Sequence, residues 1–252
     1  MCSVEHQGLL RCLFSLLISH DGQALANPLS DAVKEVFGSL GPLARSSPHF
    51  KPRAGQTDMA MAVADTLVVG GSLVVEAGTG VGKTFAYLVP ALLSGERVLL
   101  STATKTLQDQ LFARDIPDLL AALGLPLRLA MLKGRGSYVC QQRLAMAQQA
   151  ATLPDRTSAR TLAQVQTWAN TTRTGDLAEM PTLDERSPLI PVITSNRDNC
   201  LGSTCSFWKE CHVNAARKEA MAADVVVINH HLFFADLAMR EGGMAELLPS
   251  VR

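Results

Sequence analysis

The sequence lacks net charge, a long apolar run and any internal repeat. Its 23 basic residues balance 23 acidic residues, so any site for a polyanion must be a local groove. The apolar run at residues 9–19 is interrupted by Arg11 and is too short to span a bilayer. No lysine or arginine precedes that run, although a secretory signal requires a basic segment there. We therefore expect a cytoplasmic protein with no membrane contact.

The composition of the sequence is typical of a globular protein. Apolar residues make up 47% of its 252 residues and charged residues 18%, enough to bury one large core or two smaller ones. Short buried strands are predicted at residues 72–76, 97–102, 127–132 and 224–228, and helices at 29–40, 56–69 and 104–123. This alternation predicts an α/β fold with a parallel sheet, interrupted by an insertion over about 135–211.

A phosphate-binding loop lies between the first predicted strand and a helix. It fits the Walker A pattern through Ala77, Gly78, Thr79, Gly80, Val81, Gly82, Lys83 and Thr84. The glycines let backbone N–H groups turn toward phosphates, and the following helix points its positive dipole end at them. Lys83 is expected to reach the β- and γ-phosphates, and the Thr84 hydroxyl to bind Mg²⁺. The loop predicts a nucleotide site.

Two polar residues upstream of the loop are candidates for contacting the base. Arg53 and Gln56 are three residues apart, which places them on one face of a helical turn. A glutamine side chain offers both a donor and an acceptor, as an adenine edge requires. The same pair is also typical of a solvated helix start, and the spacing leaves both interpretations open.

The cysteines form a second pattern. Of six in the chain, the last four have the spacing C-x59-C-x4-C-x5-C: Cys140, Cys200, Cys205 and Cys211. In a reducing compartment such a group indicates metal binding or catalysis more often than disulfides. Four thiolates suit Zn²⁺ or an iron–sulfur cluster, and the wide gaps favour the cluster because the tight C-x2-C pairs of structural zinc sites are absent. Zinc and unrelated buried thiols stay as alternatives, and Cys2 and Cys12 are interpreted as incidental.

Together these segments resemble the DinG-like/XPD-type superfamily 2 DNA helicases, an iron–sulfur group of bacterial damage-response enzymes. The resemblance runs from Leu29 to Arg252 and depends on collinear motifs. These are FKPRAGQTDMAMAV, VVEAGTGVGKTFAYLVPAL, STATKTLQDQLFARDIP, LKGRGSYVCQQRL, DNCLGSTC with KEC, and ADVVVINHHLF.

The resemblance implies a RecA-like P-loop NTPase lobe with a mostly helical iron–sulfur cluster insertion. It divides the chain into an extension at 1–28, the first part of the lobe at 29–134, the insertion at 135–211 and a return to the lobe at 212–252. By resemblance Arg53 and Gln56 read adenine, and the four cysteines bind a [4Fe–4S] cluster. The implied cofactors are therefore ATP, Mg²⁺ and that cluster.

Several residues are expected to contact DNA. The segment STATKTLQ resembles a motif that touches the DNA backbone, where Ser101, Thr102 and Thr104 either cap the next helix or bind phosphate. Lys133 and Arg135 are candidate phosphate contacts at the start of the insertion. Tyr138 can stack on a base or pack internally. The implied partners are single-stranded or forked DNA, with replication or repair proteins as further candidates.

The segment ADVVVINHHLF could be mistaken for a Walker B element. It has Asn229 where a Mg²⁺-holding aspartate would stand. His230 and His231 have no third partner at zinc spacing nearby, so we interpret them as loop residues at a strand end.

The resemblance also predicts an Asp-Glu-Ala-His box and a second motor lobe, and neither occurs in these 252 residues. The expectation is thus the N-terminal ATP-binding lobe of a 5′–3′ DNA helicase for repair or replication, truncated before that box and inactive alone. We also expect an exposed sheet edge where the strand carrying that box would pair. One alternative is a truncated, non-catalytic nucleotide- and DNA-binding module with a cluster or zinc site. Another is an unrelated P-loop enzyme with a zinc site.

Overall fold

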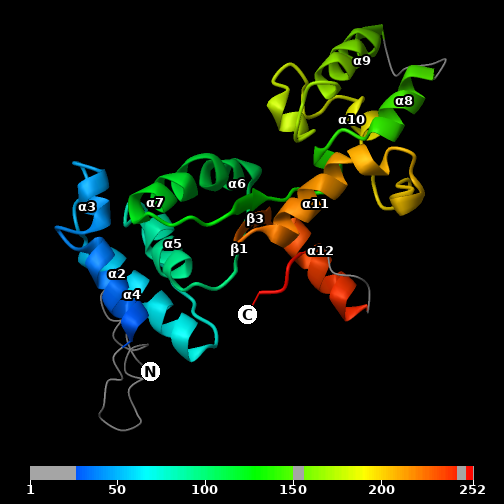
Figure 1. The fold of residues 1–252 in the computed structure, drawn as a ribbon. Coiled ribbons are helices and arrows are strands. Elements are labelled where there is room, and N and C mark those ends of the chain that lie inside the picture. The colour runs from blue at the N-terminus through cyan, green and yellow to red at the C-terminus, as the bar shows by residue number, and fades with distance from the viewer. Residues whose placement is uncertain (1–26, 150–155, 243–247, 252) are drawn as a thin grey trace, which may run out of the picture.

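The computed structural model describes residues 27–149, 156–242 and 248–251 (Figure 1). Nearly all of the predicted extension, including Cys2 and Cys12, lies outside these residues. The α-helices are α2 (Pro28–Phe37), α3 (Pro42–Ser46), α4 (Ala54–Val69), α5 (Lys83–Leu93), α6 (Lys105–Gln110), α7 (Ile116–Leu123), α8 (Gln141–Gln149), α9 (Arg156–Ala169), α10 (Ile190–Ile193), α11 (His212–Ala222) and α12 (His230–Glu241). The strands are β1 (Val98–Thr102), β2 (Leu129–Met131) and β3 (Val225–Asn229).

The described strands form one parallel sheet in the order β1-β3-β2. The central strand β3 is a run of β-branched residues, and its members from Val225 to Ile228 are completely buried. Such a run is typical of a strand covered on both faces. β1 and β3 end together, with Thr102 opposite Asn229, so their polar ends share one edge of the sheet. The predicted α/β class with a parallel sheet flanked by helices is confirmed.

The predicted strand over residues 72–76 is wrong. This segment leads into the phosphate loop in an extended form, but it pairs with none of β1, β2 and β3. A strand depends on hydrogen bonds from a neighbour as well as on apolar side chains. Here Val74 is 85% exposed, and Val75 packs against the core. The apolar pattern therefore indicated contact with the core but not pairing with a partner strand.

The helices that support the phosphate loop pack closely because small residues lie between them. α2 begins where the Asn27 side chain accepts the N–H groups of Leu29 and Ser30. α4 packs against α5, and the interface contains the fully buried Ala60 and Ala86. Alanine at such contacts lets two helix backbones approach. The start of α5, where the loop ends, is consequently held by α4.

The predicted insertion has its own hydrophobic core. Val165, Leu189 and Ile193 are completely buried in a cluster separate from that of the lobe. In Figure 1 the sheet lies between helices α2–α5 on one side and helices α8, α9 and α10 on the other. The latter three helices lie near one end of α11. α11 then leads back to the sheet and buries Ala220 beside β2 and β3. No helix among the described residues is long and apolar enough to cross a membrane.

Candidate functional site

The phosphate loop ends at a glycine that no other residue could replace without strain. Gly82 has φ +88, a left-handed conformation, and immediately precedes α5. A β-carbon built on Gly82 would lie 2.1 Å from Nε2 of Gln56. Both the backbone conformation and the available space therefore require glycine here. The helix that follows has no side-chain cap, so its first N–H groups are available to an anion.

The Lys83 ammonium lies inside the curve of the loop. It donates to the carbonyl oxygens of Ala77 and Gly78, each at 2.8 Å. The loop carbonyls thus hold the ammonium near the start of α5, and phosphate oxygens bound there would replace these carbonyls as its partners.

Arg53 and Gln56 lie directly against the phosphate loop. Arg53 donates from Nη1 to the Gly80 carbonyl at 2.8 Å, and Gln56 donates from Nε2 to the Gly82 carbonyl at 2.9 Å. Gln56 is only 4% exposed. The sequence placed the two residues near the nucleotide, but it did not reveal that they brace the loop itself. Their contact with adenine stays a prediction.

Tyr87 lies next to the loop and the buried Asp115 lies near Tyr87, although no sequence pattern marks either residue. Burial raises the pKa of Tyr87, a hydrogen bond with Thr84 opposes the rise, and the Asp115 carboxylate adds to it. Asp115 accepts hydrogen bonds from Gln110 Nε2 and Arg114 Nε, both at 2.9 Å. It lies in a π-helical turn, Leu111–Asp115, between α6 and α7. Such turns are frequent at functional sites, and no pattern in the sequence predicts one.

The ends of β1 and β3 bring together polar residues. Thr104 caps α6 by accepting the N–H of Leu107 at 3.2 Å, and Thr102 donates to the Thr104 carbonyl at 3.1 Å. Thr102 is 5% exposed, so its hydroxyl serves this internal contact. Ser101 Oγ lies 2.7 Å from Nδ1 of His230, a pairing that the sequence did not indicate.

The interpretation of His230 and His231 as loop residues is wrong, because both belong to the first turn of α12. Asn229 caps that helix, and its side chain accepts the N–H of Leu232 at 2.8 Å. A strand ending in asparagine can continue into a helix through such a cap, which explains the direct transition.

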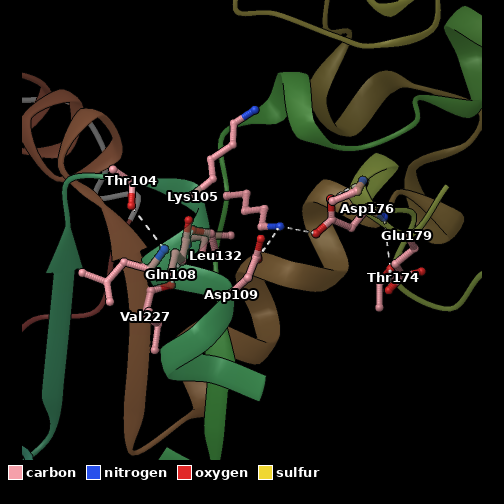
Figure 2. A network of polar contacts seen from close by, with 12 residues as sticks. Thr104, Lys105, Gln108, Asp109, Leu132, Thr174, Asp176, Glu179 and Val227 are labelled. Atoms are coloured by element: carbon pink, nitrogen blue, oxygen red, sulfur yellow. Dashed lines mark hydrogen bonds and ion pairs between the residues drawn. The ribbon is translucent and has the colours of Figure 1, made fainter. Parts of the chain in front are cut away.

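Lys133 is almost completely buried, with 4% of its side chain exposed. Its ammonium forms ion pairs with Asp176 at 2.7 Å and Asp109 at 2.9 Å (Figure 2). Burial alone would lower the pKa of Lys133, but the two carboxylates outweigh it and raise the pKa. A phosphate contact from Lys133 would have to replace these carboxylates.

Tyr138 packs internally, since it is 4% exposed, and its hydroxyl accepts the backbone N–H of Lys133 at 3.0 Å. Burial raises the pKa of Tyr138 to about 12, although the bond from Lys133 opposes the rise. In this structure Tyr138 therefore has no exposed ring face on which a base could stack.

The structure gathers the four candidate cysteines around one cavity. Cys140 precedes α8, Cys205 follows a short 3-10 turn, and Cys211 precedes α11, while Cys200 accepts a hydrogen bond from Arg135 Nη1 at 2.9 Å. All four are free thiols of intermediate burial. Apolar side chains complete the wall: Val139, Leu201, Phe207, Trp208 and Val213.

The four cysteines line one cavity, but no preformed metal site is found there among the described residues. In the part of the chain that the structure describes, no three His, Cys, Asp or Glu side chains form a group that could hold a metal ion. A tetrahedral zinc site needs sulfurs about 2.3 Å from a single ion. The described thiols therefore do not form such a site in this structure.

Positive side chains lie beside the cysteine cavity. An adjoining hollow is lined by Lys133, Arg135, Arg197 and Arg217, and it shares Ser195, Asn199 and Val213 with the cavity. Burial lowers the pKa of Arg217, the charge of Arg135 lowers it further, and the cysteines at 200 and 211 oppose the change. Arg197 and Arg217 were not candidates from the sequence, because lone arginines in a polar segment carry no pattern.

Comparison with known proteins finds helicases among the relatives of this chain. Residues 57–175 match the family model of the DEAD/DEAH box helicases. The chain is 47% identical over 218 residues to the ATP-dependent DNA helicase YoaA of Haemophilus influenzae, covering 86% of this chain and 34% of that protein. It is 38% identical over 217 residues to the ATP-dependent helicase DinG of Mycobacterium tuberculosis, covering 77% of this chain and 32% of that one. The chain thus spans about a third of the length of these curated relatives.

Proposed function

We propose that this chain, which corresponds to the N-terminal portion of a DinG-like helicase, is the ATP-binding lobe of a 5′–3′ DNA helicase for repair or replication. The observation that carries the proposal is the position of Lys83, inside the phosphate loop and at the start of α5. We place the protein in the cytoplasm. The domains we propose are an extension at 1–28, the lobe at 29–134 and 212–252, and the insertion at 135–211.

ATP and Mg²⁺ are the expected ligands in this family. The proposed triphosphate lies against the N–H groups of residues 77–84, and its oxygens replace the carbonyls of Ala77 and Gly78 as partners of Lys83. The Thr84 hydroxyl holds the metal ion. Arg53 and Gln56 brace the loop from the side on which we place adenine.

ATP hydrolysis requires more groups than ATP binding does. Phosphoryl transfer needs a carboxylate that holds the metal and usually an arginine finger, and these residues contain no Asp-Glu-Ala-His box. We propose that the chain binds ATP and turns it over at a negligible rate. The lack of an Asp-Glu-Ala-His box in these residues also favours a second candidate function, a non-catalytic nucleotide- and DNA-binding module.

We place the DNA backbone along Thr104 and Arg135. Thr104 stands at the polar edge of the sheet, and Arg135 lines the hollow that also contains Arg197 and Arg217. These groups offer hydroxyl and guanidinium donors to phosphates in a chain without net charge. Thr102 and Lys133 are buried and contribute to the shape of this surface. The proposed substrate is single-stranded or forked DNA, with repair or replication proteins as further partners.

For the cysteine cavity we propose a [4Fe–4S] cluster held by Cys140, Cys200, Cys205 and Cys211. The support is that all four thiols line one partly apolar cavity, and four cysteine thiolates are the usual ligands of such a cluster. When bound, such a cluster supplies a rigid, redox-active centre. The Arg135 guanidinium, which donates to Cys200, compensates thiolate charge there.

The proposal is tested by measuring the affinity of the 252-residue chain for a fluorescent ATP analogue. We expect Lys83→Ala to weaken binding at least about tenfold, because a charge-assisted contact to phosphate is lost. The control is Lys34→Ala, which removes an exposed lysine paired with Asp31 on α2. Equal affinity of Lys83→Ala and the parent chain would contradict the site. Rapid DNA-stimulated phosphate release that Lys83→Ala abolishes would contradict the proposed lack of turnover.

A further inference from the structure

Lys133 joins two parts of the fold that lie far apart in the sequence. Its ammonium lies between Asp109 of α6, in the lobe, and Asp176 of the insertion. In Figure 2 dashed lines mark the ion pairs that end on the labelled Asp109 and Asp176. We call this group of three charges the Lys133 bridge.

The lobe side of the bridge is firmly attached to the sheet. Gln108, next to Asp109, is completely buried and donates from Nε2 to the carbonyls of Leu132 and Val227, both at 3.1 Å. These carbonyls lie just after β2 and within β3. Any displacement of Asp109 would therefore disturb α6, whose first turn is capped by Thr104.

The insertion side is attached through Asp176. This residue forms an isolated antiparallel bridge with Tyr138, and its side chain accepts the N–H of Ala178 at 3.1 Å. The N–H of Val139 donates to the Gly175 carbonyl at 2.9 Å. Cys140 follows directly, so the bridge ends beside the cysteine cavity.

A buried ion pair has little tolerance for the loss of one member. Removing Lys133 would leave the Asp176 carboxylate, whose side chain is 10% exposed, without compensation in a poorly solvated place, whereas the Asp109 side chain is 47% exposed. The Lys133 ammonium has two partners and 4% side-chain exposure, so it is not a free donor waiting for phosphate.

We infer that Lys133 is a positioning residue, which fixes the cysteine-bearing insertion relative to α6 through Asp109 and Asp176. The consequence for DNA depends on the proposed function: the bridge keeps Arg135, in the insertion, aligned with Thr104, in the lobe. A strand that contacts both residues binds well only while the bridge is intact.

The first test is the affinity of the full chain for a labelled oligothymidylate. Asp176→Asn removes a negative charge but keeps an oxygen for the Ala178 N–H. If Lys133 positions the insertion, the affinity falls several-fold. If Lys133 contacts phosphate directly, the affinity rises, because an acid is removed and the ammonium is released. Asp184→Asn, at an exposed position of the insertion, is the control for a general charge effect.

The salt dependence of binding by Lys133→Met separates the same two roles. Loss of one phosphate contact reduces the slope of log affinity against log salt by about 0.7 for single strands. A positioning residue lowers the affinity and leaves the slope unchanged. A slope reduced by that amount, with affinity raised in Asp176→Asn, would overturn the inference.

Hydrogen exchange tests the bridge without DNA. In both variants we expect the Val139 and Ala178 amides to exchange at least about tenfold faster, while the amides of α4 keep their rates. Unchanged exchange at Val139 and Ala178 in Asp176→Asn would overturn the inference, even if Lys133→Met fails to fold. Faster exchange in a chain that does not bind DNA would support the bridge and contradict the proposed DNA contact.

Discussion

Nε2 of Gln56 lies 2.9 Å from the carbonyl oxygen of Gly82, the residue immediately before Lys83. The contact joins α4 to the end of the phosphate loop and fills the space that a side chain at position 82 would need. A residue predicted to read a base is therefore also part of the support of the loop. The relation leads to a test that compares two glycines of the chain.

Gly82→Ala is expected to weaken nucleotide binding and stability more than Gly95→Ala. Both glycines have a left-handed φ, +88 and +74, which costs a residue with a β-carbon about 1 to 2 kcal/mol. Only at Gly82 does the β-carbon also meet a neighbour, Gln56, whereas nothing lies within 4 Å at Gly95. Thermal unfolding and binding of a fluorescent ATP analogue measure both effects. Equal losses in the two variants would contradict this packing, and adding Gln56→Ala to Gly82→Ala should recover only part of the loss.

The chain has two tyrosines, and both are expected to resist ionisation. Burial raises the pKa of Tyr87, and it raises that of Tyr138 to about 12. Because the folded pKa exceeds the unfolded value of 10.0, the stability linked to Tyr138 is complete below pH 10 and is lost between pH 10 and about 12.

Absorbance at about 295 nm, which follows tyrosinate formation, provides the measurement. We expect the native titration to lie above that of the chain in denaturant, and Tyr138→Phe to remove the component that titrates last. Tyr138→Phe also leaves the Lys133 N–H without its acceptor, at a cost of about 1 kcal/mol at neutral pH. Coinciding native and denatured titrations would show that neither hydroxyl is buried.

The sequence predicted those features that depend on local patterns. The apolar runs that became β1, β2 and β3 and the loop that wraps around Lys83 are recognisable from composition and spacing. The prediction of a strand at residues 72–76 failed for a physical reason. A strand needs a partner strand, and the apolar pattern of one segment does not show whether a partner is present.

The sequence indicated which candidate residues lie together, but not what each of them contacts. The four cysteines that were grouped by their spacing line one cavity, and cysteine is rare enough for four of them to form a recognisable pattern. Lys133 was expected at a phosphate because it lies at the start of the predicted insertion. Its partners, Asp109 and Asp176, are 24 and 43 positions away along the sequence, and ordinary acids at such separations carry no signal.

The cysteine cavity leads to a prediction about iron. After anoxic purification or reconstitution, the chain should contain roughly four iron atoms and show broad absorbance near about 400 nm. Cys200→Ser should lower both values, because one of four ligands is lost. Cys12→Ser, outside the C-x59-C-x4-C-x5-C pattern, is the control and should change neither. Stoichiometric zinc with no iron would contradict the cluster and support the zinc alternative.

Gln108→Met is expected to destabilise the lobe by about 1 to 3 kcal/mol. Gln108 is completely buried, and Nε2 supplies hydrogen bonds to the carbonyls of Leu132 and Val227. Methionine has a similar volume but leaves both carbonyls without these donors. A buried acceptor that loses its donor costs free energy, because it is removed from water without a replacement hydrogen bond. Within the described part of the chain Oε1 of Gln108 has no partner, so its removal restores part of the loss.

Urea unfolding of Gln108→Met measures the change in free energy, with Gln148→Met as the control. Gln148 lies on an exposed face of α8 and bonds only to the Gln166 side chain among the contacts described, so its replacement should cost less than about 0.5 kcal/mol. If the two variants unfold at the same urea concentration, Gln108 does not fasten α6 to the sheet. The Lys133 bridge would then have no rigid attachment on its lobe side.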